Sequence, residues 1–217
     1  MGVESSWLFY GLACLIGYLF GSVPFGLVIT KLAGLGDIRD IGSGNIGATN
    51  VLRTGRKDLA LATFVLDSGK AGMAALLFFF VAKAVNPELN PPIALLAGAS
   101  ALVGHCFPVW LGFKGGKGVA TYAGLLFASV WMIGLIAAAS WLLIAFIFRR
   151  SSLAALVTAI LMPILAWGLN YQVSEVIILA LLTLLVLWRH KTNIQRLLDG
   201  TEPKIGQKSK TNSADTA

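Results

Sequence analysis

Six long apolar segments dominate this chain, and they leave few folds open to it. In order, they run from Trp7 to Ala33, Asp58 to Val85, Pro92 to Phe113, Val119 to Phe148, Ser151 to Leu169 and Val173 to Trp188. Most reach the roughly 20 residues that a helix needs to cross a hydrocarbon core. None shows the alternating pattern of a membrane β-barrel strand. Charged residues make up 12% of the chain, against about 25% in soluble proteins. The sequence therefore predicts an all-α integral membrane protein.

The segment from Val119 to Phe148 is too long for a single crossing. As one helix its 30 residues would reach roughly 45 Å, whereas a hydrocarbon core is about 30 Å thick. We therefore expect two short helices, each short for a full span. The break signals in this segment are Ser129 and Gly134, and they do not fix where the first helix ends.

The placement of positive charges also favours two helices in this segment, because Lys and Arg near the ends of spans collect on the cytoplasmic side. With the N-terminus outside, the loop from Gly34 to Lys57 and the loop holding Lys117 are cytoplasmic. The Arg149–Arg150 pair and the basic C-terminal stretch join them only if Val119–Phe148 crosses twice. The prediction is a polytopic bundle of about seven transmembrane helices, with a periplasmic N-terminus and a cytoplasmic C-terminus. The outer face would carry Glu4, Glu88 and Glu175.

The chain reads as one transmembrane domain over residues 1–202. The segment from Trp7 to Ala33 is too long for the core of a signal peptide and has no cleavage site, so we expect it to remain as a membrane helix. Residues 203–217 are polar and rich in small side chains, which predicts a disordered cytoplasmic tail. Cys14 and Cys106 lie in apolar segments and are expected to pack as small hydrophobic residues.

The excess of basic residues, 17 against 10 acidic, does not predict nucleic-acid binding. The cations are divided among short loops between spans, as membrane topology requires, and no soluble domain presents a basic face. We expect membrane lipid around the protein and no nucleic-acid partner.

The first of two glycine-rich polar stretches runs from Gly42 to Asn50 and is followed by Arg53. Glycine lets backbone N–H groups form a concave nest for an anion, and Ser43, Asn45 and Thr49 add short polar donors. If the chain turns helical after Gly47, Arg53 lies one turn beyond Thr49 on the same face. The stretch predicts a phosphate site; the alternative is a tight loop or a close helix contact.

The second stretch, Phe113–Gly118, resembles a nucleotide-binding P-loop only superficially. Three residues, not four, separate Gly112 from Gly116-Lys117, and Gly118 follows instead of Ser or Thr. No nucleotide cofactor is therefore expected. Lys117, flanked by glycines, is a candidate phosphate ligand, whereas Lys114 is equally well explained as a topological anchor.

A third polar cluster follows the last apolar segment. His190, Asn193 and Arg196 share one helical face, which can grip a substrate or relay a proton. The alternative is that these are ordinary basic residues following a membrane helix, but this would not explain Asn193. His105, at the end of an apolar helix, is left open between a packing role and a catalytic one.

Asp67 and Lys70 are the remaining charges inside an apolar segment. They either pair at i, i+3 within a helix or, if the span begins near Ser68, lie at the cytoplasmic interface. Both positions remain open from the sequence.

On this topology the polar clusters reach the cytoplasmic face or its boundary, which favours one composite site. A transporter of phosphate esters would place its ligands near the midplane between two similar halves, and the chain shows no such repeat. A lipid-binding scaffold with polybasic loops is a third possibility. The clusters favour an enzyme.

Together the three motifs resemble the membrane acyl-phosphate:glycerol-3-phosphate acyltransferase family (PlsY type) of bacterial phospholipid synthesis. The resemblance rests on Asp37–Arg39 with Gly42–Arg53, on Gly104–Pro108 with Phe113–Thr121, and on Arg189–Leu197 with Gly200 and Glu202. It implies a seven-helix enzyme of the bacterial inner membrane whose active site faces the cytoplasm. It further implies acyl transfer from acyl phosphate, not from acyl-CoA or acyl carrier protein, to the 1-hydroxyl of glycerol 3-phosphate, with lysophosphatidic acid and inorganic phosphate as products.

These residues are compatible with direct attack of the glycerol 3-phosphate hydroxyl on acyl phosphate, without a covalent intermediate on the enzyme. Acyl phosphate is already activated, so orientation and charge stabilisation can supply much of the rate. The predicted phosphate-binding residues are Ser43, Asn45, Thr49, Arg53 and Lys117, while His190 and Asn193 orient the glycerol. His190, Lys117 and Arg53 are the catalytic candidates, and the base is either His190 or the leaving phosphate. No metal or other cofactor is expected, and functional coupling to the acyl-phosphate-forming enzyme is the expected partnership.

Overall fold

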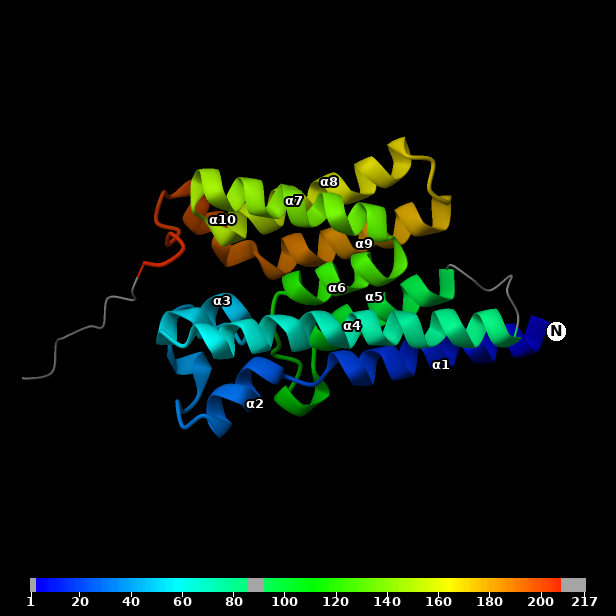
Figure 1. Cartoon of the computed structure of the whole chain (residues 1–217), viewed down its shortest axis with the longest axis horizontal. Helices are drawn as coiled ribbons and strands as arrows, with labels where there is room; N and C mark the ends of the chain where they lie inside the picture. Colours follow the sequence, from blue (N-terminus) through cyan, green and yellow to red (C-terminus); the bar gives the residue numbers. More distant parts are fainter. Residues whose placement is uncertain (1–2, 86–91, 208–217) are drawn as a thin grey trace, which may run out of the picture.

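The computed structural model describes residues 3–85 and 92–207, and the regular elements in those ranges are all helical. The α-helices are α1 (Val3–Gly21), α2 (Phe25–Leu32), α3 (Ala48–Val51), α4 (Lys57–Val85), α5 (Pro92–Cys106), α6 (Val119–Ser129), α7 (Trp131–Phe148), α8 (Ser151–Gly168), α9 (Val173–Arg189) and α10 (Lys191–Leu198). The long helices lie side by side along one axis (Figure 1). The all-α prediction is confirmed.

Among the described residues, five helical segments are long and apolar enough to cross a membrane, or six if the bent pair α9 and α10 counts as one span. Helix α6 has 11 residues, which span roughly 16 Å, and is shorter than a full crossing. The protein is thus an integral membrane protein, and the count of about seven transmembrane helices stays a prediction.

The long apolar segment from Val119 to Phe148 forms two helices, as expected. Helix α6 ends at Ser129, and Val130, with φ −139° and ψ 62°, separates it from α7. The second break signal, Gly134, lies inside α7, where a side chain would collide with the backbone of Leu126 and Phe127. That glycine permits the tight return of α7 against α6.

The first apolar segment does not form one continuous helix, contrary to the expectation from its hydropathy. Helix α1 ends at Gly21 and α2 begins at Phe25. Pro24 has no N–H to continue the helical bonding and disfavours a helical conformation at Val23. At the break the Val23 carbonyl accepts the Phe25 N–H at 3.1 Å and a hydrogen bond from Lys70 Nζ at 3.0 Å.

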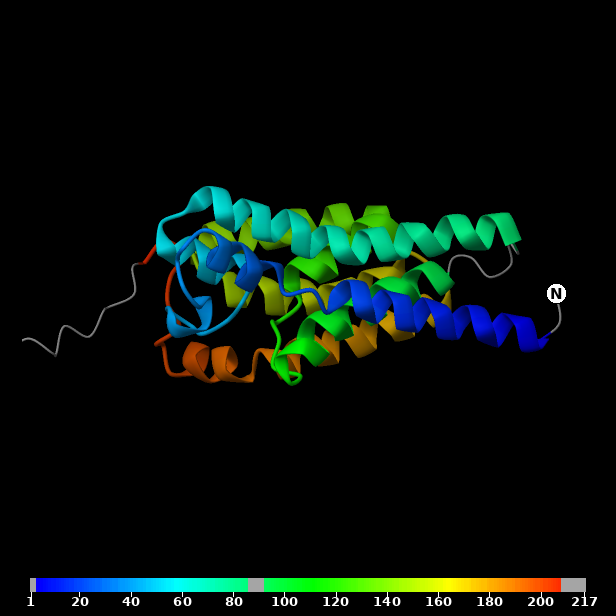
Figure 2. The same ribbon diagram turned by 90° about the horizontal axis from the view of Figure 1, so that it is seen from below.

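Helix α5 occupies the centre of the bundle, in contact with α1, α4, α6 and α9 (Figure 2). Small residues allow the close approach: a side chain at Gly17 or Gly21 would overlap the α5 backbone, and one at Gly124 would overlap the Ser68 carbonyl of α4. Large apolar side chains on the outer helices, such as Phe146 at 85% exposure, face outward. This arrangement suits a protein whose solvent is lipid.

The basic regions gather at one end of the bundle. The chain between α2 and α4, the Arg149–Arg150 turn between α7 and α8, and α10 all lie there, opposite the start of α1 and the α8–α9 turn (Figure 1). Glu175 lies at that opposite end, where its carboxylate accepts the Gln172 N–H at 3.0 Å and caps α9. The position of Glu88 lies outside the described residues, as does the side chain of Glu4.

The packed structure continues past the expected domain end at residue 202. The Ile205 N–H donates to the Arg149 carbonyl at 2.6 Å, and the segment up to Gln207 borders a pocket. The start of the expected disordered tail at residue 203 is therefore too early, because Pro203–Gln207 belong to the folded part. The remainder of that prediction, residues 208–217, lies outside the described residues.

Candidate active site

The buried amide of Asn50 shapes the first glycine-rich loop. Its Nδ2 donates to the carbonyls of Ile38 and Ile41, both at 2.9 Å. Its Oδ1 accepts the Ser43 N–H at 3.0 Å and a guanidinium N–H of Arg53 at 3.3 Å. Asn50 thus closes the loop on itself and holds Ser43 and Arg53 on one side of it.

The chain turns helical directly after Gly47, which is the condition for Arg53 to lie one turn beyond Thr49. Helix α3 covers Ala48–Val51, and a 3-10 turn follows over Leu52–Thr54. Arg53 therefore follows Thr49 by one turn. Gly42 at φ +59° and Gly44 at φ +68° adopt the left-handed conformation that glycine accepts without strain.

The second glycine-rich loop is fixed from two sides. The N–H groups of Gly115 and Gly116 donate to the carbonyls of Cys106 and His105 at the end of α5, at 3.2 and 3.0 Å. Arg189 of α9 donates to the carbonyls of the same two glycines, at 2.6 and 3.0 Å. The loop therefore presents Lys117 from a rigid base.

A chain of hydrogen bonds links Lys117 to the third motif. Lys117 Nζ donates to Asn193 Oδ1 at 2.5 Å, and Asn193 Nδ2 donates to Glu202 Oε1 at 2.7 Å. Glu202 also accepts Ser152 Oγ at 2.6 Å and Arg196 Nε at 2.7 Å. The carboxylate is the common acceptor that orients Asn193 toward Lys117.

One cavity of about 540 Å³ brings the sequence-predicted site residues together. The predicted residues that line it are Ser43, Asn45, Thr49, Arg53, Lys117, His190 and Asn193. Its polar end is formed by the three motifs, and its remaining walls are mostly apolar side chains of α4, α6, α7 and α8, among them Phe64, Leu126 and Leu142. Lys114 is exposed and does not border this cavity.

Burial and neighbouring charge tune the titratable groups at the polar end. Burial, together with the positive charge of Arg196, lowers the pKa of Lys117 to about 8. Burial likewise lowers the pKa of Arg53, although the charge of Glu202 opposes this. Burial would raise the pKa of Glu202, but hydrogen bonds from Ser152, Asn193 and Arg196 outweigh it and lower the pKa. The site is cationic, with Glu202 ionised.

His190 lies one residue beyond the end of α9 and is 2% exposed. Burial lowers its pKa to about 4, so the imidazole is neutral near pH 7. Its Nδ1 is 2.8 Å from the Val186 carbonyl, which can only accept, so Nδ1 carries the proton. Nε2 is consequently left with a lone pair that can accept a hydrogen bond.

The structure also decides the alternatives left open for the internal charges. Asp67 and Lys70 lie well inside α4, not before its start, and pair with Oδ1 2.9 Å from Nζ. Lys70 Nζ is also 2.7 Å from His105 Nδ1, and all three side chains are buried. His105 is therefore part of a packed ionic cluster beside the cavity, which Asp67 and His105 also border.

Sequence reasoning missed the supporting residues. Asn50, Ser152 and Glu202 are buried polar side chains that hold the predicted ones, and Arg189 braces the lysine loop. Asn50 and Arg189 were part of recognised motifs, as was Glu202. Nothing in the local pattern around Ser152 pointed to the site, because its partner lies 50 residues away.

The arrangement combines two chemistries in one space. Arg53, Lys117 and the glycine-loop donors can neutralise phosphate groups, while neutral His190 and Asn193 can hydrogen-bond a hydroxyl. The adjoining apolar walls can accommodate a hydrocarbon chain. The cavity thus suits a reaction between an anionic polar molecule and a lipid-like one.

Comparison with known proteins agrees with this chemistry. Residues 11–200 match the family model described as glycerol-3-phosphate acyltransferase. A glycerol-3-phosphate acyltransferase of Maricaulis maris is 58% identical over 203 residues, covering 93% of this chain and 89% of the relative. One of Rhodospirillum rubrum is 58% identical over 204 residues, covering 94% of each chain.

Two crystal structures of PlsY, an integral membrane glycerol 3-phosphate acyltransferase, share the fold. The glycerol 3-phosphate form is 36% identical with a TM-score of 0.83, covering 91% of this chain and 96% of its own. The lysophosphatidic acid form is 35% identical with a TM-score of 0.80, covering 91% of this chain and 95% of its own.

Proposed function

This chain belongs to the glycerol-3-phosphate acyltransferase family, and on that premise we propose that it acylates the 1-hydroxyl of sn-glycerol 3-phosphate with acyl phosphate as donor. The products would be lysophosphatidic acid and inorganic phosphate, as in the first acylation step of bacterial phospholipid synthesis. The observation that carries the proposal is the single cavity in which Arg53, Lys117 and His190 adjoin apolar walls. An acyl phosphate and a small phosphate ester fit this cavity, because one end of it is cationic and its other walls are apolar.

The cationic end is compatible with acyl phosphate as the donor. Two phosphate groups, one on each substrate, must approach each other there, and Arg53 and Lys117 reduce their mutual repulsion. The Phe113–Gly118 loop departs from a nucleotide P-loop in spacing, which gives no support for a nucleotide-bearing donor.

The proposed step is direct attack. The 1-hydroxyl oxygen forms an ester bond with the acyl carbonyl carbon while the bond from that carbon to the phosphate oxygen breaks, and the electron pair leaves with the phosphate. Lys117 and Arg53 stabilise the departing charge. His190 Nε2 accepts a hydrogen bond from the hydroxyl and orients it. With its pKa lowered to about 4, His190 is a weak base, so we assign the proton to the leaving phosphate.

We place the protein in the bacterial inner membrane with its active site toward the cytoplasm. The support is the gathering of the Arg149–Arg150 turn, the loop before α4 and α10 at one end of the bundle, since cationic loops stay in the cytoplasm. Acyl phosphate would be taken from the enzyme that forms it.

The test is phosphate release by purified protein given palmitoyl phosphate in detergent or lipid without divalent metal. Release that requires glycerol 3-phosphate and forms lysophosphatidic acid is expected. Absence of release, even after metal or acyl-CoA is added, would contradict the proposal. Uptake of glycerol 3-phosphate into proteoliposomes without product would then identify a transporter, and binding of anionic lipid without turnover a scaffold.

The direct mechanism has its own check. Incubation with radiolabelled acyl phosphate alone should leave no label on the denatured protein. A stable acyl group on Ser43, absent from Ser43→Ala, would require a covalent intermediate.

A further inference from the structure

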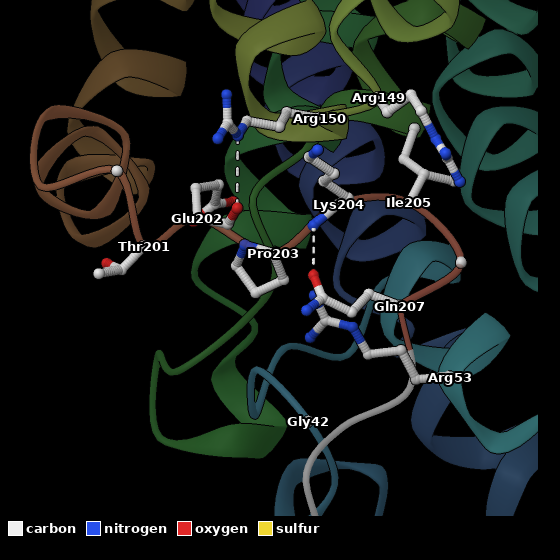
Figure 3. A pocket seen from close by; sticks show the side chains of 12 residues that line it. Gly42, Arg53, Arg149, Arg150, Thr201, Glu202, Pro203, Lys204, Ile205 and Gln207 are labelled. Atoms are coloured by element: carbon white, nitrogen blue, oxygen red, sulfur yellow. Dashed lines mark hydrogen bonds between the residues drawn. The ribbon is translucent and has the colours of Figure 1, made fainter.

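A second pocket, of about 750 Å³, lies beside the catalytic cavity at the basic end of the bundle. Three separate segments form it: the first glycine-rich loop with Arg53, the Arg149–Arg150 turn, and the stretch from Gly200 to Gln207 (Figure 3). Arg53 and Glu202 border both spaces, so the two adjoin through these side chains. We call this second pocket the antechamber, because it adjoins the first.

Positive charge exceeds negative charge in this antechamber. Four cations line it, namely Arg53, Arg149, Arg150 and Lys204. In the described part of the chain none of them has a carboxylate within ion-pair distance. Glu202 is the one acid among the lining residues, and its carboxylate is already engaged by Ser152, Asn193 and Arg196. An excess of cations around one space favours an anionic ligand.

The walls of the antechamber are fixed by the fold. The Ile205 N–H bonds to the Arg149 carbonyl at 2.6 Å, and the Lys204 N–H bonds to Gln207 Oε1 at 3.1 Å. Arg150 Nε reaches the Glu202 carbonyl at 3.4 Å. Arg149 itself adopts a left-handed backbone conformation at φ +54°, which is uncommon for a residue other than glycine. These bonds fix the backbone of the turn and of the C-terminal stretch around the pocket, and Arg150 is also held through its side chain.

Membrane topology alone does not require this arrangement. The positive-inside preference is met by cations anywhere on the cytoplasmic loops, and exposed Lys57 and Lys191 meet it without lining either space. Topology gives no reason for basic side chains from three segments far apart in sequence to surround one pocket next to the catalytic one.

We propose that this antechamber is a second binding site for a phosphate monoester or inorganic phosphate dianion, distinct from the site where acyl transfer occurs. Under the proposed function, its occupant is glycerol 3-phosphate on the way in or inorganic phosphate on the way out. A cationic pocket raises the local concentration of an anion and speeds its capture, most strongly at low ionic strength.

The binding test uses no acyl donor, so it stands apart from catalysis. Equilibrium dialysis with radiolabelled inorganic phosphate should show one phosphate per chain fewer for the double variant Arg150→Gln/Lys204→Gln than for the parent protein. The charge-matched control Lys57→Gln/Lys191→Gln should bind as many as the parent. Equal binding by the parent and the pocket variant, or an equal loss in the control, would overturn the proposal.

Kinetics then separate the two sources of phosphate. In the pocket variant kcat should stay near the parent value, because neither residue belongs to the catalytic machinery. A rise of about tenfold in KM for glycerol 3-phosphate, less dependent on salt than the parent KM, assigns the pocket to the substrate. A similar rise confined to the inhibition constant of phosphate assigns it to the product. Unchanged values of both would count against the site.

If the double variant does not fold, the single variant Lys204→Gln tests the second site. Lys204 is exposed, and its side chain has no hydrogen bond in the described structure, so Lys204→Gln alone should keep the parent unfolding temperature. It should still weaken phosphate binding at the second site several-fold, and an unaltered affinity would speak against the proposal.

Discussion

Lys117 Nζ lies 2.5 Å from Asn193 Oδ1, although the two residues are 76 positions apart in the chain. The contact joins the loop before α6 to α10. Because Asn193 gives its amide N–H to Glu202, its oxygen is turned toward Lys117. The ammonium group has three protons, so the others remain available to phosphate in the cavity.

Removal of the Lys117 charge should cost most of the activity. We expect Lys117→Ala to lower kcat/KM by roughly 10²- to 10³-fold, the usual cost of losing one group that stabilises developing charge. Lys114→Ala is the matched control, because Lys114 is exposed and outside the cavity; it should stay within about threefold of the parent. Equal, small effects on steady-state kinetics would remove Lys117 from the site.

The pH dependence of kcat/KM should reflect the titration of Lys117. With the pKa of Lys117 lowered to about 8, its ammonium is lost as pH rises through about 8, and kcat/KM should fall there. The Lys117→Arg variant keeps its charge at high pH, so whatever activity it retains should lack this fall. A parent profile that stays level to about pH 10, near the ordinary lysine pKa, would contradict the assignment.

Glu202 should matter for stability as well as for activity. In Glu202→Gln, the neutral amide cannot accept every bond that Ser152, Asn193 and Arg196 now donate, and each lost charge-assisted bond costs roughly 1.5–3 kcal/mol. We expect this variant to have both a lower unfolding temperature in detergent and a lower kcat. Asp199→Asn, at an exposed position in the same region, is the control and should change neither.

A side chain at position 116 should disturb the structure. A Cβ there would overlap the imidazole of His105, which Lys70 holds in place through a 2.7 Å contact. Gly116→Ala should therefore displace the Lys117 loop and reduce activity sharply. Gly69→Ala, in α4 with open space around it, should be active and equally or more stable, since Ala favours a helix by about 1 kcal/mol over Gly. Comparable losses from both substitutions would contradict the steric argument.

The buried cluster of α4 should be sensitive to loss of one partner. Asp67→Asn leaves the Lys70 charge buried with no opposite charge, and we expect a loss of about 3–5 kcal/mol in unfolding free energy. Adding Lys70→Met should recover part of it, because the unpaired charge is removed. Thermal unfolding in one detergent checks both, and a double variant less stable than Asp67→Asn would refute this account.

Sequence patterns predicted much of the helix layout because hydropathy reports directly on burial in lipid. The excess length of Val119–Phe148 predicted two helices, and α6 and α7 confirm it. At Trp7–Ala33 the segment is long and apolar enough to span a membrane, but hydropathy does not register that Pro24 interrupts the hydrogen bonding between α1 and α2. It also set the folded end too early, because a polar segment such as Pro203–Gln207 can be held by backbone bonds to a distant turn.

The chain by itself determined the membrane class, because hydropathy reports on burial in lipid, and its three polar motifs predicted the residues of the candidate site. Tertiary structure alone decided which groups act on one another. It turned His105 from an open candidate into a partner of Lys70, and it made Glu202 the shared acceptor behind Asn193. It also placed Arg53, Arg150 and Lys204 around one pocket. Such contacts depend on how helices pack, which local sequence does not encode, since the partners lie tens of residues apart.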